Sequence, residues 1–135
     1  MKKIVLGIVS VGLLSLGACQ TMKEAKNVAE LGVSFAWKDS HRCSSVSPAF
    51  KIASVPSGTK TLKFWMTDLQ VTSFTHGGGS VEYKGSGDIP EGAFGYTGPC
   101  PPSGSHQYEF KVTAINAAGD TVLGRGTAMR PFPPQ

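Results

Sequence analysis

The sequence has little of what a nucleic-acid-binding protein or a helical bundle needs. It carries 13 basic and 9 acidic side chains, and this balance is too even for the clustered basic face that binds a nucleic acid. In no segment do apolar residues recur with the 3.6-residue period of a long helix, and no internal repeat is present. These absences exclude a nucleic-acid partner and a fold built from helices.

Cysteine and histidine are scarce, with three residues of each in the chain. No two of them have the Cys-x₂-Cys or His-x₃-His spacing that is typical of zinc sites. The side chains that a zinc ion would use are the His-x-Cys pair of His41 and Cys43, together with His76, Cys100 and His106. We therefore expect no metal and no cofactor, with zinc as the weaker alternative.

Glycine and proline are abundant instead, at 17 and 9 residues, which suits a domain rich in turns. Between the turns, apolar and polar residues alternate, as they do in strands with one buried face. The alternating segments lie near residues 31–37, 50–53, 62–68, 80–83, 106–114 and 121–128. The sequence therefore predicts a mainly β fold, an antiparallel β-sandwich.

The first 18 residues resemble a bacterial lipoprotein signal peptide. Two lysines precede an uncharged apolar stretch of 13 residues, which is too short to span a bilayer as a helix of about 20 residues. Small residues then precede Cys19, and in proteins with such signals this thiol is acylated after the signal is removed. The resemblance implies that residues 1–18 are cleaved and that Cys19 carries the lipid, palmitate included.

Lipidation of Cys19 would place the protein in the bacterial cell envelope. Two or three acyl chains give stable anchoring, because each buried CH₂ contributes about 0.8 kcal/mol. In the lipoproteins that this signal resembles, an Asp after the Cys favours the inner membrane; Gln20 stands there instead, so the resemblance implies the outer membrane, facing the periplasm. Residues 19–30 have few large apolar side chains and are expected to form a tether, while residues 31–135 form one domain.

Polar residues continue the apolar faces of two predicted strands. Asp68 is in phase with the apolar residues before it, and His106 and Tyr108 are in phase with those after them. Because side chains two positions apart share a face of a strand, we expect all three to point toward the core at strand ends. Buried polar groups cost about 1–3 kcal/mol unless they are paired. The pattern therefore predicts partners or a ligand, and His76, beside three glycines, adds a second imidazole.

Residues 95–108 carry a specific motif, Gly-Tyr-x-Gly-Pro-x-Pro-Pro followed by a short spacer and His-x-Tyr. This motif resembles a signature of the phosphatidylethanolamine-binding protein family, which includes the bacterial Raf kinase inhibitor-like proteins. The resemblance extends over about residues 35–128. It implies a β-sandwich with a small pocket for phosphate-like groups, including the phosphatidylethanolamine head group. Carried over by position, the ligand-binding residues are Asp68, His76, Gly98, Pro99, His106 and Tyr108.

The chain departs from the family pattern near this pocket. Leu69, Gln70 and Gly77 stand where the family has Pro, Asp and Trp. The C-terminal helical region of the family is absent or reduced to residues 130–135. These departures predict a pocket with a wider mouth.

The pocket residues have expected roles. His76 and His106 donate N–H bonds to an oxyanion, and Tyr108 donates its O–H or braces a histidine. Asp68 cannot attract an anion, so we expect it to accept from an imidazole, fix its tautomer and favour its protonated form. The alternative is that Asp68 accepts from the ammonium of an ethanolamine head group.

Cys43 and Cys100 are the two thiols that remain if Cys19 is lipidated. In an oxidising compartment such a pair is predicted to form a disulfide. A nucleophilic pair of Cys100 and His106 is the alternative. Because no residue is placed as a nucleophile with both a base and an oxyanion hole, we expect no enzymatic activity.

Two functions are compatible with these patterns. The first is a periplasm-facing, lipid-anchored binding module for a small anion or a phosphate-bearing head group. The alternative is a protein-interaction or inhibitor module whose pocket is structural. The sequence identifies no partner protein for either.

Overall fold

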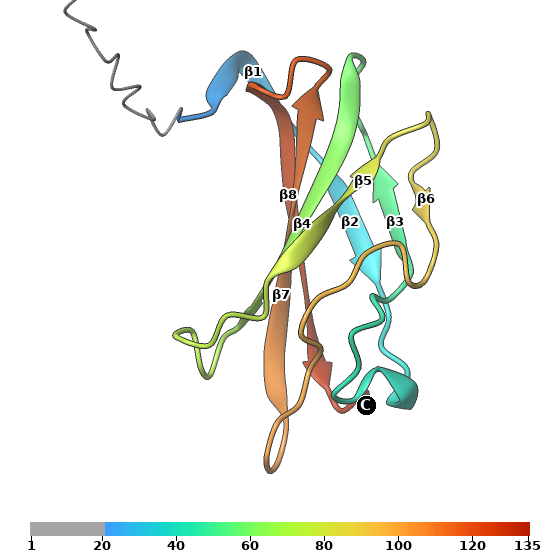
Figure 1. Cartoon of the computed structure of the whole chain (residues 1–135), viewed down its shortest axis with the longest axis vertical. Coiled ribbons are helices and arrows are strands. Elements are labelled where there is room, and N and C mark those ends of the chain that lie inside the picture. Colours follow the sequence, from blue (N-terminus) through green and yellow to red (C-terminus); the bar gives the residue numbers. More distant parts are fainter. Residues whose placement is uncertain (1–20) are drawn as a thin grey trace, which may run out of the picture.

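A computed structural model describes residues 21–135, which form two packed β-sheets (Figure 1). The signal peptide, Cys19 and Gln20 lie outside the described residues. The larger sheet has five strands in the order β1 (Lys23–Glu30), β8 (Thr121–Phe132), β7 (His106–Asn116), β4 (Thr59–Asp68) and β5 (Gly78–Glu82). The smaller sheet has the order β2 (Gly32–Phe35), β3 (Phe50–Ala53) and β6 (Asp88–Ile89). One short 3₁₀ helix, η1 (Asp39–His41), completes the described elements.

The predicted mainly β sandwich is confirmed, and its pairs are antiparallel apart from β1, which runs parallel to β8. The expected tether differs from the structure, because Lys23–Glu30 is strand β1. Backbone pairing holds this polar strand: Lys23 donates to the Asp120 carbonyl, and the Arg125 side chain binds Glu24. The regular sheet therefore starts before residue 31.

The core forms where the alternating faces of β4 and β7 meet the small sheet. Phe64 lies opposite Val112, and Met66 lies opposite Phe110, in the β4–β7 register, and all four side chains are buried. Phe50 of β3 covers them, with its ring 4.9 Å from that of Phe110. Burying large apolar side chains contributes about 1.5–3 kcal/mol each, so this cluster fixes how the two sheets pack.

The long strand β8 joins the two ends of the molecule. Its first residue, Thr121, pairs with Lys23, and its last, Phe132, pairs with His106. The strand has 12 residues, and its eleven steps of about 3.3 Å separate these ends by roughly 36 Å. The family's C-terminal helical region was expected to be absent or reduced to residues 130–135, and residues 130–132 continue strand β8.

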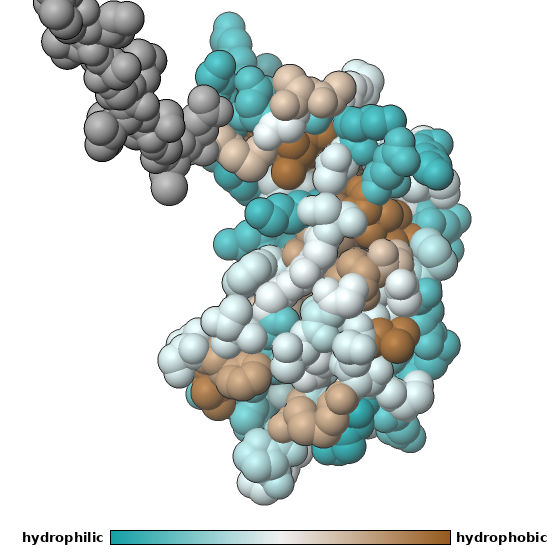
Figure 2. Space-filling view, viewed as in Figure 1, coloured by the Kyte–Doolittle hydropathy of each residue, from teal (hydrophilic) through white to brown (hydrophobic). Residues whose placement is uncertain are grey.

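The surface is mixed in character. Figure 2 shows small apolar areas separated by polar residues on the face in view. Within residues 21–135, no helix is long and apolar enough to cross a membrane.

Candidate functional site

A cavity of about 260 Å³ lies at the Phe132 end of the sandwich and gathers most of the predicted pocket residues. The chain segments that meet there are the end of β4, the loop before β5, the loop before β7 and the start of β7. The lining residues are Asp68, Val71, Phe74, His76, Thr97, Gly98, Cys100, Pro101, Pro102, His106 and Tyr108. Two wider depressions on the small sheet have only Lys51 and Asp88 as charged lining residues, whereas both histidines lie beside a carboxylate in this cavity.

Strand pairing explains why residues far apart in sequence share the site. Asp68, the last residue of β4, lies directly opposite Tyr108 of β7. His106 lies two residues before Tyr108, and side chains two apart share a face of a strand. The in-phase placement predicted for these three residues is confirmed, because Asp68 and Tyr108 are buried and all three line the cavity.

Asp68 is held by three hydrogen bonds. Its Oδ2 accepts from Nδ1 of His106 at 2.6 Å, and its Oδ1 accepts from the backbone N–H groups of Gln70 at 2.8 Å and Val71 at 3.1 Å. Burial of the carboxylate opposes its ionisation, but these hydrogen bonds outweigh burial and lower the pKa of Asp68. These bonds let Asp68 orient His106, and Oδ2, which accepts only one bond, keeps a second lone pair.

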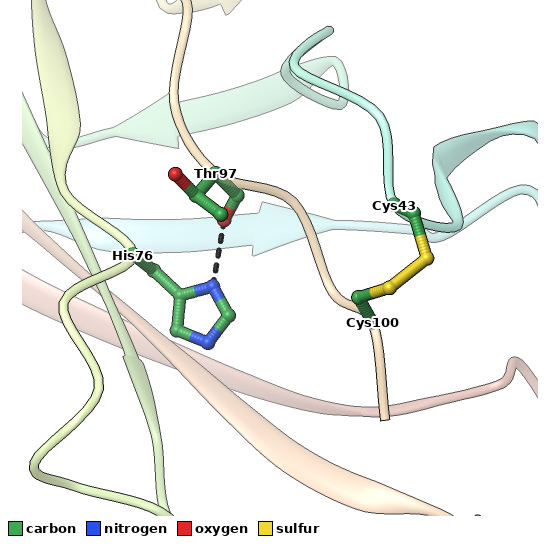
Figure 3. Close-up of a disulfide and its surroundings, with 4 residues drawn as sticks. All are labelled: Cys43, His76, Thr97 and Cys100. Atoms are coloured by element: carbon green, nitrogen blue, oxygen red, sulfur yellow. Dashed lines mark hydrogen bonds between the residues drawn. A yellow bond between two sulfur atoms is a disulfide. The ribbon is translucent and has the colours of Figure 1, made fainter. Parts of the chain in front are cut away.

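His76 is held in a similar way by the opposite wall. Its Nδ1 lies 2.6 Å from the carbonyl oxygen of Thr97 (Figure 3). The backbone reinforces this contact, because the Thr97 N–H donates to the His76 carbonyl at 2.8 Å. The His76 ring also contacts the rings of Phe74 at 4.7 Å and Tyr108 at 5.5 Å between centroids. His76 is thus fixed in the cavity wall despite lying outside the regular strands.

The two histidines leave the same atom for a ligand. A carbonyl oxygen and an ionised carboxylate only accept hydrogen bonds, so Nδ1 of each ring carries a proton. Nε2 of each ring has no hydrogen-bond partner within residues 21–135. Neither Nε2 atom is fully buried, so a ligand can reach both. Nε2 accepts when the ring is neutral and donates when the ring is protonated. The site can therefore donate two N–H bonds to an oxyanion only after both rings gain a proton.

Tyr108 contacts both imidazoles of the cavity. Its ring stacks on His106 at 6.2 Å and meets His76 edge-on. Burial, followed by the nearby Asp68 carboxylate, raises the pKa of Tyr108 to about 12. Tyr108 therefore stays neutral, and its ring braces both histidines.

The predicted disulfide between Cys43 and Cys100 is confirmed (Figure 3). Their Cα atoms lie 4.6 Å apart, within the range that a disulfide requires. The bridge removes both thiols, which excludes the alternative of a Cys100 nucleophile and leaves no cysteine ligand for zinc at this site. Among the described residues, no group of three or more His, Cys, Asp or Glu side chains could hold a metal ion.

The remaining predicted pocket residues, Gly98 and Pro99, have different positions. Gly98 lines the cavity, and a Cβ added to it would lie 2.0 Å from the Ser44 carbonyl oxygen. Only glycine fits that close approach. Pro99 is fully buried and is not among the lining residues; its carbonyl accepts from the Cys43 N–H at 2.8 Å. Pro99 thus supports the wall from behind.

Sequence reasoning missed the apolar part of the cavity. Val71 and Phe74 line it from the loop after β4, and both are more than two-fifths exposed. Neither residue belongs to an alternating segment, so the available signal was only their proximity to Asp68 and His76. Gln70 does not line the cavity; its Oε1 accepts from the Gln107 N–H at 2.6 Å and ties this loop to β7.

Comparisons with known proteins agree with this architecture. No protein-family model matches the chain. Over 32 residues, 24% of this chain, the sequence is 60% identical to a UPF0098 protein from Archaeoglobus fulgidus, and the match spans 10% of that protein's length. A solved structure described as a phosphatidylethanolamine-binding protein homologue from Chlamydia trachomatis is similar in fold, with a TM-score of 0.55 and 17% identity. That likeness covers 81% of this chain and 99% of the other.

The structural likeness confirms the fold that the motif in residues 95–108 implies. The chain has the fold of a phosphatidylethanolamine-binding protein homologue. At 17% identity this likeness is a statement about fold, so function has to be argued from the cavity itself.

Proposed function

We propose that this protein is a lipid-anchored binding module that captures a small anion or a phosphate-bearing head group between His76 and His106. The observation that carries the proposal is the arrangement of the two imidazoles. Each has Nδ1 committed to an oxygen of the protein and Nε2 left for a ligand. Two protonated rings would then offer two charge-assisted N–H donors to one oxyanion.

The side chains around the two histidines strengthen the binding of such a ligand. Val71, Phe74, Tyr108 and the half-cystine Cys100 line the cavity beside the histidines. An apolar wall reduces screening and strengthens each hydrogen bond. Charge-assisted bonds contribute about 1.5–3 kcal/mol each. Two of them, less the cost of desolvation and ordering, support micromolar to millimolar affinity.

The anchor and the place of binding are part of the same proposal. The signal-like residues 1–18 and Cys19 support attachment to the outer membrane, with the domain facing the periplasm. No catalytic step is proposed, because the cavity combines two hydrogen-bonded histidines with a disulfide instead of a free nucleophile.

Calorimetry tests the binding. Sulfate, phosphate and phosphoethanolamine are titrated into wild type, His106→Ala and His76→Ala at about pH 6 and about pH 8. We expect wild type to bind more tightly at the lower pH, and each variant to lose about tenfold in affinity, since it lacks one donor. Asp88→Asn is the matched control, because Asp88 is an exposed partner of Lys51 on the small sheet.

The outcomes separate the two functional classes. Equal affinity in wild type and both histidine variants would contradict binding at this cavity. Absence of binding for all three anions would favour the alternative, an interaction or inhibitor module in which the cavity is structural.

A further inference from the structure

His41 is a buried histidine that does not line the cavity. It is 1% exposed and ends helix η1. Its Nδ1 accepts a hydrogen bond from the backbone N–H of Lys38 at 2.9 Å, so the neutral ring carries its proton on Nε2. Nε2 is buried with no hydrogen-bond partner among residues 21–135. The Oε1 atom of Glu91 lies 3.6 Å away, which is too long for a hydrogen bond.

The turn that contains His41 supports one wall of the anion cavity. Cys43, two residues later, donates its backbone N–H to Pro99 and forms the disulfide with Cys100. The wall also packs on the turn directly, since a Cβ added to Gly98 would lie 3.2 Å from the His41 carbonyl oxygen. A change in the conformation of this turn therefore reaches the cavity through short covalent and hydrogen-bonded links.

Protonation of His41 is incompatible with the observed contacts. An imidazolium carries N–H groups on both nitrogens and cannot accept from Lys38. The charged groups that face the ring, within the described part of the chain, are the Glu91 carboxylate from the segment after β6 and the Lys38 ammonium. Burial lowers the pKa of His41; Glu91 opposes this shift, and Lys38 adds to it.

We propose that neutral His41 is a positioning residue for the 98–100 wall of the cavity, and that its protonation loosens this wall and sets an acid limit to anion binding. The binding readout of this inference rests on the proposed function. The two requirements oppose each other, because His76 and His106 need protons to donate from Nε2, whereas His41 must remain neutral. Anion affinity should therefore pass through a maximum as pH falls.

A ligand-free NMR titration tests the coupling in the folded domain. The ring signals of His41 and the amide signals of Gly98 and Cys100 are followed from about pH 8 to about pH 4. We expect the two amides to share the midpoint of His41. In His41→Asn, the amide oxygen replaces Nδ1 as acceptor and does not titrate, so this midpoint should disappear. The proposal would be overturned if the amide signals of Gly98 and Cys100 do not shift as His41 titrates in wild type. It would also be overturned if they keep the same midpoint in His41→Asn.

Sulfate calorimetry supplies the second readout, because sulfate does not titrate in this range. Below the His41 midpoint, wild-type affinity should fall by at least about threefold, whereas the affinity of His41→Asn should show no such fall. Glu91→Gln removes the carboxylate that favours protonation, so its acid limit should move to lower pH, while Asp88→Asn should match wild type. Identical curves for wild type and His41→Asn would refute the acid limit. If sulfate fails to bind at every pH, the proposed function fails, and the ligand-free amides alone decide the role of His41.

Discussion

Replacing Asp68 with asparagine should change how anion binding depends on pH. In wild type, the carboxylate accepts from Nδ1 of His106 and holds the proton on that nitrogen. In Asp68→Asn, the new side-chain amide would keep its oxygen for the backbone N–H groups of Gln70 and Val71 and turn its NH₂ group toward the ring. Neutral His106 would then accept at Nδ1 and carry its proton on Nε2, where it can donate without being protonated.

The magnitude follows from counting protons and bonds. In wild type, an anion that receives bonds from both Nε2 atoms takes up as many as about two protons, one for each ring. In Asp68→Asn only His76 needs one, so the slope of log affinity against pH should be about half as steep. At about pH 6 the variant should bind about tenfold more weakly, since a neutral donor contributes roughly 1–1.5 kcal/mol less than a charged one.

Sulfate calorimetry between about pH 8 and about pH 6 measures both effects. Asp88→Asn makes the same chemical change in an exposed ion pair with Lys51 and should behave as wild type. A wild-type slope in Asp68→Asn would refute the reasoning, because it would mean that His106 does not depend on this carboxylate for its proton.

Three further predictions concern stability, and one concerns the anchor. The hydrogen bonds that lower the pKa of Asp68 stabilise the fold at pH values above about 4. In urea denaturation, the free energy of unfolding should therefore decrease as the pH falls below about 4. The decrease should be smaller in Asp68→Asn. Replacing Cys43 and Cys100 together with serine should lower the free energy of unfolding by about 4 kcal/mol, from their separation of 57 residues; an unchanged denaturation midpoint would contradict this. Gly98→Ala should lower the free energy of unfolding by about 1–3 kcal/mol, because its Cβ would collide with the Ser44 carbonyl oxygen. A variant that melts at the same temperature as the wild type would exclude that collision. Palmitate labelling should tag the wild type but not Cys19→Ser, and an unlabelled, freely soluble wild type would contradict the anchor.

Alternation in the sequence was sufficient to predict six of the eight strands of the described chain and the polar end of the core. Asp68 and Tyr108 belong to runs whose apolar members are buried, and the period of two places them with that core. The pairing of their strands then brings them opposite each other. These features depend on local periodicity, which a single sequence displays directly.

Features that depend on distant backbone pairing or on loops were not predictable in the same way. The residues of β1 lack a clear alternation and are fixed by parallel pairing to β8, about a hundred residues later. Phe74 reaches the cavity from a loop, where spacing does not indicate direction. His41 looked like one histidine in a polar segment, and only its burial and its bond from Lys38 distinguish it.

The distance along β8 has a consequence for where a ligand can come from. The first residue of β1 pairs at one end of this strand, and His106 pairs at the other, roughly 36 Å away. If the proposed lipid on Cys19 holds the protein upright by its N-terminal end, the cavity would face the surrounding solution, well beyond the head groups of the holding membrane. Dissolved anions, or head groups on an opposing surface, would then have direct access. A head group of the holding membrane would enter only when the long axis of the domain lies down along that membrane.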